Sequence, residues 1–286
     1  MRVAFRVWRM SRGKNEKGGG HSMRFTKMQG TGNDYIYINC FCESVTDPRQ
    51  LAVTLCRPHF GVGADGVILI GPSAVADCKM KMYNADGSEG LMCGNGIRCV
   101  GKYVYETGIV PKRDLTVETM SGVKELELET VLDTVVSVKV NMGHPVRKKS
   151  VNIQEQGYSL EIHPVSLGNP HGVIWVSDPE TFPVDRLGEK LERAPLFPDG
   201  FNVEFASIQN RREIRMRVWE RGSQETLSCG SGACAVFAVA FGLGLVDAAV
   251  TVHLPGGDLE VSTLDEGETV FLKGPAQMVF EGDFFI

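Results

Sequence analysis

Hydrophobic and polar residues of this chain alternate or cluster in short runs, a pattern typical of β-strands. The clearest alternation is Lys124–Glu129, where leucines alternate with charged residues. In the first half we predict strands at 23–27, 35–39, 67–70, 79–83, 123–129 and 135–140. In the second half we predict strands at 159–162, 173–176, 203–208 and 214–219, with more toward the C-terminus. The chain is therefore expected to be rich in β-structure.

Three helices are predicted between these strands. The first covers Pro48–Cys56, with Asp47 as its N-cap and proline at its first position. The second follows Cys93 and ends near Gly108. The third lies in the apolar run Ala233–Val246, which is too short to span a membrane and fits a buried helix.

The second and third helices follow the same sequence signature. Leu91–Gly96 reads LMCGNG and Leu227–Gly232 reads LSCGSG, and each is preceded by a Gly-Ser pair and a glutamate four residues before its cysteine. A gene duplication explains this repeat. It predicts an α+β fold of two similar halves, each with strands around a central helix, and a cleft between the two helix starts.

The composition suits a globular protein, since 43% of its 286 residues are hydrophobic. Six basic residues and one acid give residues 1–22 a charge of +5, which leaves −10 on the remainder of a chain with a net charge of −5. A basic targeting peptide is one explanation for this segment, but the glycine-rich stretch before Met23 favours an extension or tag. We therefore expect an extension at 1–22 and halves at 23–140 and 141–286, with a last strand that could return to the first half. The acidic body disfavours nucleic-acid binding.

The eight cysteines form no Cys-x-x-Cys pair and no zinc-ligand spacing with histidine, so no metal site is expected. No apolar secretory signal precedes Met23, which favours a reducing cytoplasm and free thiols. Six of the cysteines are interpreted as small core residues: Cys40, Cys42, Cys56, Cys78, Cys99 and Cys234.

The other two, Cys93 and Cys229, are predicted to lie at helix N-termini, where free N–H groups and the helix dipole stabilise a thiolate or a ligand carboxylate. Inversion of a stereocentre by proton transfer needs a base on one face and an acid on the other. A thiolate and a thiol facing one cleft satisfy this need. A redox sensor that forms a Cys93–Cys229 disulfide, or an amino-acid binding module, remains an alternative of a different class.

Taken together, the motifs along the chain resemble those of diaminopimelate epimerase from Met23 to Ile286. They are Gly30–Asp34 (GTGND), Gly61–Gly66 (GVGADG), Asn84–Glu89 (NADGSE), Cys93–Gly96 (CGNG), Gly168–His171 (GNPH), Glu220–Gly222 (ERG) and Cys229–Gly232 (CGSG). Each motif alone is weak, but their ordered combination is specific.

The resemblance implies a cofactor-independent epimerase that interconverts LL- and meso-diaminopimelate for lysine and peptidoglycan synthesis. It implies two pseudo-symmetric halves, each a barrel-like sheet around a helix, and a cytoplasmic homodimer that contacts neither nucleic acid nor membrane. Cys93 would be the base toward the LL substrate and Cys229 the acid, with Asp65, His171 and Glu220 tuning the thiols. The implied substrate-binding residues are Asn33, Asn84, Gly94, Asn95, Asn169, Asn202, Glu220, Arg221, Gly230 and Ser231.

Some positions leave room for other interpretations. His171 could be a surface histidine, and Glu220-Arg221 an exposed ion pair, although Glu220 lies nine residues before Cys229 as Asn84 does before Cys93. Gly66 stands where some family members carry a substrate-contacting side chain, so any contact there would come from the backbone. A related racemase acting on histidine or proline is the nearest alternative, and Asn95 and Glu220-Arg221 favour diaminopimelate.

Overall fold

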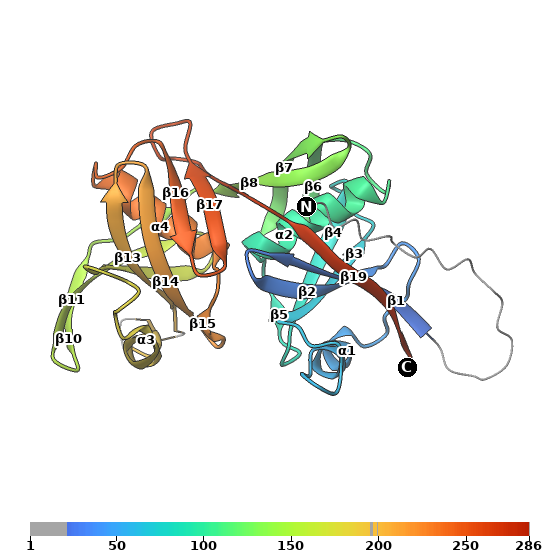
Figure 1. Cartoon of the computed structure of the whole chain (residues 1–286), viewed down its shortest axis with the longest axis horizontal. Helices are drawn as coiled ribbons and strands as arrows, with labels where there is room; N and C mark the ends of the chain where they lie inside the picture. The colour runs from blue at the N-terminus through green and yellow to red at the C-terminus, as the bar shows by residue number, and fades with distance from the viewer. Residues whose placement is uncertain (1–21, 195–196, 199, 286) are drawn as a thin grey trace, which may run out of the picture.

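The structure, a computed structural model, describes residues 22–194, 197–198 and 200–285. These residues form two lobes that lie side by side, each a curved sheet around a central helix (Figure 1). The predicted α+β class with two pseudo-symmetric halves is confirmed. The extension predicted at 1–22 lies outside the described residues, except for Ser22, which begins the first strand.

In the part of the chain that the structure describes, the first lobe contains eight strands, one of them only two residues long, and two helices. Its elements are β1 (Ser22–Gly30), β2 (Asn33–Asn39), α1 (Pro48–Leu55), β3 (Gly66–Gly71), β4 (Cys78–Asn84), β5 (Glu89–Gly90), α2 (Gly94–Glu106), β6 (Asp114–Thr119), β7 (Gly122–Val131) and β8 (Thr134–Gly143).

The second lobe repeats this order after the two strands β9 (Val146–Arg147) and β10 (Val151–Glu155), and a final strand follows it. Its further elements are β11 (Tyr158–Ser166), β12 (Pro170–Trp175), α3 (Val184–Glu192), β13 (Asn202–Asn210), β14 (Glu213–Glu220), β15 (Gln224–Thr226), α4 (Gly230–Gly242), β16 (Ala249–Leu254), β17 (Gly257–Ser262), β18 (Val270–Gly274) and β19 (Gln277–Phe285).

Strand pairing shows that the two lobes are copies of one topology. The parallel pairs β2–β3 and β4–β6 of the first lobe correspond to β12–β13 and β14–β16 of the second. The intervening antiparallel pairs β3–β4 and β13–β14 also correspond, and α1 and α3 occupy the same place in the order. The duplication inferred from the cysteine motifs thus extends through the whole fold.

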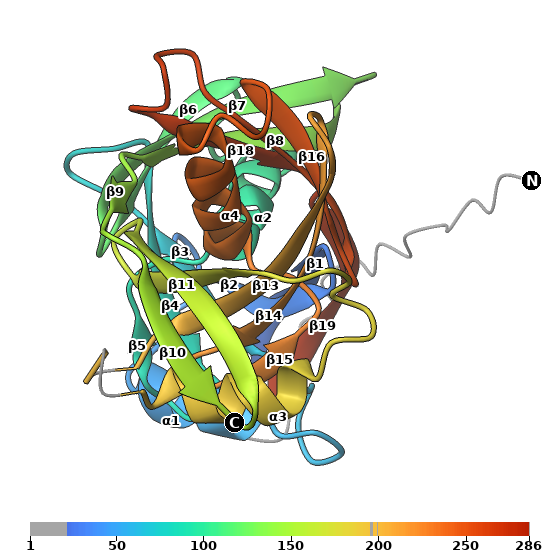
Figure 2. The same ribbon diagram turned by 90° about the vertical axis from the view of Figure 1, so that its left-hand side faces the viewer.

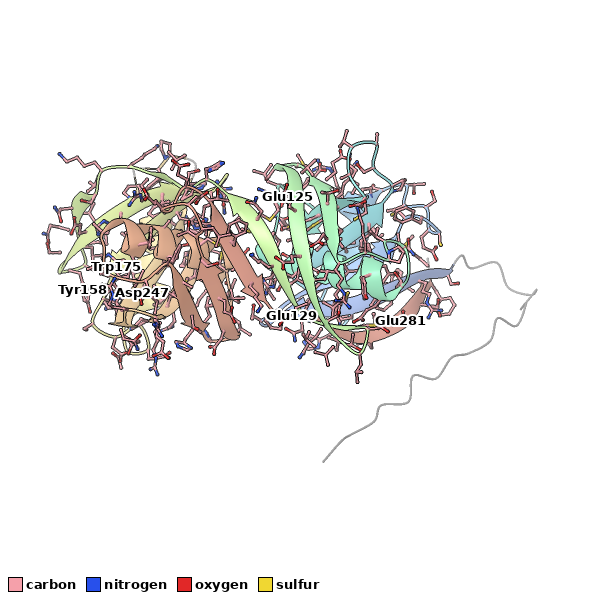
Figure 3. The ribbon with its side chains drawn as sticks, turned by 90° about the horizontal axis from the view of Figure 1, so that it is seen from above. Glu125, Glu129, Tyr158, Trp175, Asp247 and Glu281 are labelled. Atoms are coloured by element: carbon pink, nitrogen blue, oxygen red, sulfur yellow. The ribbon has the colours of Figure 1, made fainter. Side chains whose placement is uncertain are left out.

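Two connections join the lobes. β8 of the first lobe pairs antiparallel with β18 of the second, and β19 crosses back to pair with β1 (Figure 1). Figure 3 shows the result from above, with Glu125 and Glu129 on one lobe, Tyr158 and Asp247 on the other, and Glu281 of β19 beside the first. The strand ladder is therefore continuous from one lobe to the other.

The helices α2 and α4 form the centres of the two lobes (Figure 2). α4 is apolar on all sides, and its residues 232–240 are buried, which fits a helix enclosed by strands. Glycines allow the close packing, since a Cβ at Gly101 of α2 would lie 2.8 Å from the Leu126 side chain. Cys99 and Cys234 are buried within these helices, as predicted.

Several sequence predictions are confirmed in detail and others are wrong. Asp47 caps α1 by accepting a hydrogen bond from the Gln50 N–H at 3.0 Å. The helix α3 was not predicted; its N-cap Pro183 makes no side-chain cap bond, and Asp185 is the acidic residue in its first turn. Cys42 is exposed, so its interpretation as a core residue is wrong, whereas Cys40 is partly buried and packs against the core; both follow the end of β2.

A buried polar network fixes the lobes to each other next to the helix starts. The Thr31 and Ser228 hydroxyls are 2.7 Å apart, and the Asn95 amide donates to the Ser228 carbonyl at 3.1 Å. Arg98, fully buried, donates to the Asn95 side-chain oxygen at 2.8 Å and to the Thr31 hydroxyl at 3.3 Å. These four side chains connect the β1–β2 turn and α2 of one lobe to the residue before Cys229 in the other.

We predict that Ser228→Ala destabilises the protein by about 1–3 kcal/mol, because it leaves the buried Thr31 hydroxyl without its shortest hydrogen bond. Urea unfolding measures this change. Ser137→Ala, which removes a hydroxyl that bonds Glu129 on the outer surface of β8, is the control and should cost less than about 0.5 kcal/mol. Equal unfolding midpoints for the two variants would contradict the proposed importance of the network.

Candidate active site

The N-termini of α2 and α4 meet at the junction of the lobes. A Cβ added to Gly94 would lie 3.5 Å from the Gly230 Cα, and one added to Gly230 would lie 3.4 Å from the Gly94 Cα. Cys93 and Cys229 are the N-cap residues of these helices. Both predicted cysteines are therefore brought together, each at the positive end of a helix dipole.

Cys93 both accepts and donates hydrogen bonds. Its sulfur accepts from the Gly96 N–H at 3.3 Å, which suits a thiolate, and its S–H donates to the Asn33 side-chain oxygen at 3.2 Å, which suits the neutral thiol. Burial raises the pKa of the Cys93 thiol, while the Gly96 N–H and a hydrogen bond from the Tyr35 hydroxyl lower the pKa. The backbone and Tyr35 thus offset part of the desolvation of this side chain.

Asp65 acts on this half of the site through Asn33. Its carboxylate accepts from the Asn33 amide at 2.6 Å and from the Asp34 backbone N–H at 2.9 Å. This leaves the Asn33 oxygen directed at the Cys93 sulfur. Burial raises the pKa of Asp65, and the bonds from Asp34 and Asn33 partly oppose that rise.

Cys229 has more acidic surroundings. The thiol is 5% exposed, and its sulfur lies 3.6 Å from the Ser231 hydroxyl. Burial and then the charges of Glu220 and Glu204 raise its pKa well above that of a free thiol. The two thiols therefore differ in their surroundings, although the helices that carry them are equivalent.

Glu220 ends β14 and contributes to both halves of the site. The half-buried carboxylate accepts from the Thr226 hydroxyl at 2.6 Å and bonds the Cys229 side chain. Burial raises its pKa, and its negative charge in turn raises the pKa of Cys93 and of Cys229. It is not the exposed ion pair that the sequence left open.

His171 is fully buried on β12 rather than on the surface. Its Nδ1 lies 2.6 Å from a carboxylate oxygen of Glu204, and its Nε2 lies 3.1 Å from the Asn169 side-chain oxygen. The Asn169 amide donates to the Ser231 hydroxyl at 3.4 Å. A chain of polar contacts thus leads from Glu204 to the residues beside Cys229.

The remaining predicted residues lie at the same ends of the strands. The Asn84 amide donates to the Ser88 hydroxyl at 2.9 Å, and Asn202 accepts from the Arg221 backbone N–H at 2.9 Å. Asn202 is paired beside His171 in the parallel register of β12 and β13, whereas the Arg221 side chain is exposed. Asn95 uses its side chain for the lobe junction, and its backbone N–H bonds Cys93.

Gly66 is explained by the packing of Tyr35. A Cβ at this glycine would clash with the Tyr83 carbonyl and lie 2.8 Å from the Tyr35 ring. The ring occupies the space where a larger residue would place its side chain, and its hydroxyl bonds Cys93. Tyr35 was missed in the sequence analysis, as were Glu204 and Thr226. The sequence contains a signal for Tyr35, because this tyrosine lies two residues after Asn33, as His171 lies two residues after Asn169.

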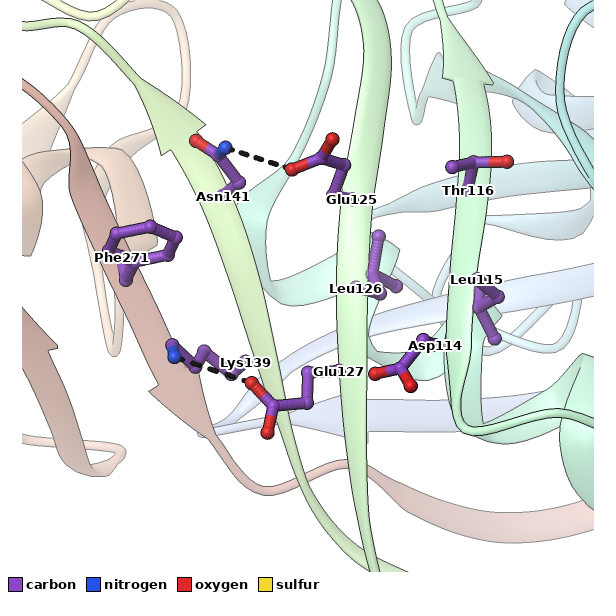
Figure 4. Close-up of a pocket in the computed structure, with 9 residues that line it drawn as sticks. All are labelled: Asp114, Leu115, Thr116, Glu125, Leu126, Glu127, Lys139, Asn141 and Phe271. Carbon is purple, nitrogen blue, oxygen red and sulfur yellow. Dashed lines mark hydrogen bonds and ion pairs between the residues drawn. The ribbon is translucent and has the colours of Figure 1, made fainter.

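No group of three His, Cys, Asp or Glu side chains within the described parts of the chain could hold a metal ion. A hollow of about 370 Å³ lies over β6, β7, β8 and β18 (Figure 4), and its lining includes none of the predicted site residues. Its surface pairs, Lys139 with Glu127 and Asn141 with Glu125, belong to ordinary cross-strand contacts.

Comparison with known proteins agrees with the geometry. The sequence model of the family described as "Diaminopimelate epimerase" matches residues 25–148 and 164–279. A diaminopimelate epimerase of Acetivibrio thermocellus is 45% identical over 274 residues, covering 91% of this chain and 98% of that protein. One from Parabacteroides distasonis is 45% identical, covering 91% and 97%, and one from Methanococcus maripaludis is 42% identical, covering 92% and 100%.

The chain belongs to the diaminopimelate epimerase family. Its fold is also shared with more distant solved structures. A hydroxyproline epimerase of Agrobacterium vitis matches with a TM-score of 0.74 at 17% identity, covering 93% of each chain. A Bacillus anthracis protein of the phenazine biosynthesis PhzF family matches with a TM-score of 0.74 at 16% identity, covering 93% of this chain and all of that chain. Like other members of its family, the chain is an isomerase.

The contacts of Cys93 lead to a prediction about the reactivity of this thiol. Tyr35→Phe removes a hydrogen bond that lowers the pKa of the Cys93 thiol, so the pKa rises and less thiolate is present at neutral pH. Alkylation of Cys93 by iodoacetamide, followed by peptide mass spectrometry, should slow about 3- to 10-fold.

Tyr37→Phe is the matched control. This buried tyrosine lies on the same strand, but its hydroxyl donates to the Gly96 carbonyl at 3.2 Å rather than to the thiol. The variant should alkylate at close to the unmodified rate. Equal slowing in both variants would mean that the effect comes from packing and not from the Tyr35 hydroxyl.

Proposed function

We propose that the protein interconverts LL- and meso-diaminopimelate by proton transfer between two thiols at the α-carbon. The observation that supports this most directly is the pair of cysteines at the N-caps of two abutting helices from duplicated lobes. An α-carbon held between the sulfurs would meet a base on one face and an acid on the other.

In this proposal Cys93 takes the proton from the LL substrate and Cys229 delivers one to the opposite face. The hydrogen bond from the Gly96 N–H suits Cys93 to the thiolate state. The acidic neighbours of Cys229 favour its protonated state, which suits the acid. In the reverse direction the two thiols exchange roles.

The helix starts supply the binding site for the reacting carboxylate. Backbone N–H groups of Gly94-Asn95 and of Gly230-Ser231 belong to the first turns of α2 and α4, where they have no partner within their helix. A carboxylate between them would lie at two positive dipole ends. The same groups would stabilise negative charge that develops as the α-proton leaves.

Polar residues at the strand ends would bind the rest of the substrate. Diaminopimelate has a second ammonium and a second carboxylate, so its site needs both hydrogen-bond donors and acceptors. Asparagine side chains offer both, and an arginine offers a bidentate fork for a carboxylate. We assign this role to Asn33, Asn84, Asn169, Asn202, Glu220 and Arg221, with Asp65 and His171 orienting their neighbours.

The proposal extends to the organisation of the protein. The thiols provide the acid and the base, so the reaction requires no cofactor. We propose an epimerase unit of halves 23–140 and 141–286, with the last strand returning to the first half, that works as a cytoplasmic homodimer. Within the described residues, no helix combines the length and the apolar character needed to cross a bilayer.

We predict that the reduced protein converts LL-diaminopimelate to the meso isomer without added cofactor. Chiral chromatography of the reaction mixture measures the product. Proline and histidine, tested in parallel, should racemise at least about 100-fold more slowly, because they lack the second amino-acid end that the strand-end residues would bind. Faster turnover of proline or histidine than of LL-diaminopimelate would show that the proposed substrate is wrong.

Cys93→Ala and Cys229→Ala should each lower kcat by at least about 1000-fold, because each removes a group that transfers a proton. Cys99→Ala removes a buried thiol of α2 outside the reaction centre and is the control for handling of the protein. Full epimerisation by either active-site variant would disprove the two-thiol mechanism.

A further inference from the structure

Glu204 occupies a position that is apolar in the other lobe. In the first lobe the register of β3 and β4 pairs Ile68 with Met82, two residues before Asn84. In the second lobe the register of β13 and β14 pairs Glu204 with Val218, two residues before Glu220. Because Asn84 and Glu220 lie at equal distances before their cysteines, Ile68 and Glu204 are equivalent positions.

Packing against the helices supports this equivalence. A Cβ added to Gly96 of α2 would lie 2.7 Å from the end of the Ile68 side chain. One added to Gly232 of α4 would lie 2.9 Å from the Glu204 carboxylate. Both side chains therefore fill the space beneath the first turn of the central helix, and an isoleucine is sufficient for that purpose in the first lobe.

A carboxyl group at the same place has an energetic cost. Glu204 is fully buried, and within the described residues one of its oxygens has no hydrogen-bond partner. Burial raises its pKa. Burying a polar group with an unsatisfied oxygen is unfavourable compared with burying a hydrocarbon. The second lobe therefore bears a free-energy cost that the first lobe avoids, which indicates that Glu204 has a role other than packing.

The contacts of Glu204 identify that role. Its other oxygen lies 2.6 Å from His171 Nδ1. The opposite nitrogen of the ring faces the Asn169 side-chain oxygen, an acceptor, at 3.1 Å, so the ring donates from Nε2. This fixes the Asn169 amide toward Ser231, whose hydroxyl lies 3.6 Å from the Cys229 sulfur.

We propose that Glu204 is a positioning residue for the Cys229 half of the reaction centre, where it orients His171, Asn169 and Ser231 in series. In the first lobe Asp65 holds the equivalent asparagine, Asn33, directly, and Tyr35 stands at the position of His171 and Ile68 at that of Glu204. The effect of Glu204 on kcat/KM rests on the proposed function, whereas its effect on the Cys229 thiol does not.

Two substitutions test the proposal. Glu204→Ile copies the residue of the first lobe and removes both the charge and the hydrogen bond to His171. Glu204→Gln removes the charge and keeps a hydrogen-bonding group. Ile68→Leu, a conservative change at the equivalent position, is the matched control, and thermal unfolding checks that each variant is folded.

We expect Glu204→Ile to lower kcat/KM at least about 30-fold and Glu204→Gln less than about 10-fold. Iodoacetamide should alkylate Cys229 about threefold faster or more in both variants, since loss of the nearby negative charge lowers the pKa of this thiol. The Cys93 rate should stay within about twofold of the unmodified protein.

Folded Glu204→Ile protein with unchanged kcat/KM would overturn the proposal, as would equal changes in the alkylation of the two thiols, which indicate a general structural effect. If the unmodified protein lacks epimerase activity but the Cys229-selective change is larger in Glu204→Ile than in Glu204→Gln, the proposed function fails and the positioning role of Glu204 stands.

Discussion

The contact between the first turns of α2 and α4 is the constraint on which the site depends. Gly94 and Gly230 approach each other there, and a Cβ at Gly230 would lie 3.4 Å from the Gly94 Cα and 2.8 Å from the Leu272 side chain. Two positive dipole ends repel each other, so their approach is stabilised when an anion binds between them. A substrate carboxylate meets this condition, and so does a thiolate at either N-cap.

The rest of the fold holds this contact in place. The β8–β18 pair and the crossing strand β19 join the lobes at their sheets, and the network of Thr31, Asn95, Arg98 and Ser228 joins them at the helix starts. The fully buried guanidinium of Arg98 donates to the carbonyl of Gly94 itself at 3.1 Å. The geometry of the reacting groups is therefore set by residues that do not contact the thiols.

The duplicated lobes give symmetry to the backbone but not to the side chains around the sulfurs. Cys93 has Tyr35, Asn33 and a backbone N–H as neighbours, whereas Cys229 has Glu220, Glu204 and Ser231. Hydrogen-bond donors from Gly96 and Tyr35 on one side and carboxylates on the other separate the protonation states of two chemically identical groups. An asymmetric pair of this kind is ready to accept a proton on one face and give one on the other.

Much of this arrangement could be predicted from the sequence, because local patterns determine it. The repeated Cys-Gly-x-Gly motif places each cysteine before a helix, and the alternation of Lys124–Glu129 identifies β7. Long-range register could not be read in this way. The burial of Glu204 against His171 depends on the pairing of β13 with β12 and β14, and Tyr35 meets Cys93 only because Gly66 leaves room for its ring. The start of α3 has no capping side chain, since Pro183 stands at its N-cap.

Early-time proton NMR in D2O with LL-diaminopimelate tests the central claim most directly, because it follows the α-proton through single turnovers. Two thiols on opposite faces predict that the first meso product carries solvent deuterium at the inverted carbon, while the remaining LL substrate keeps its proton. Product that retains the substrate proton, or substrate that exchanges without inversion, would mean that one group serves both faces and would contradict the account.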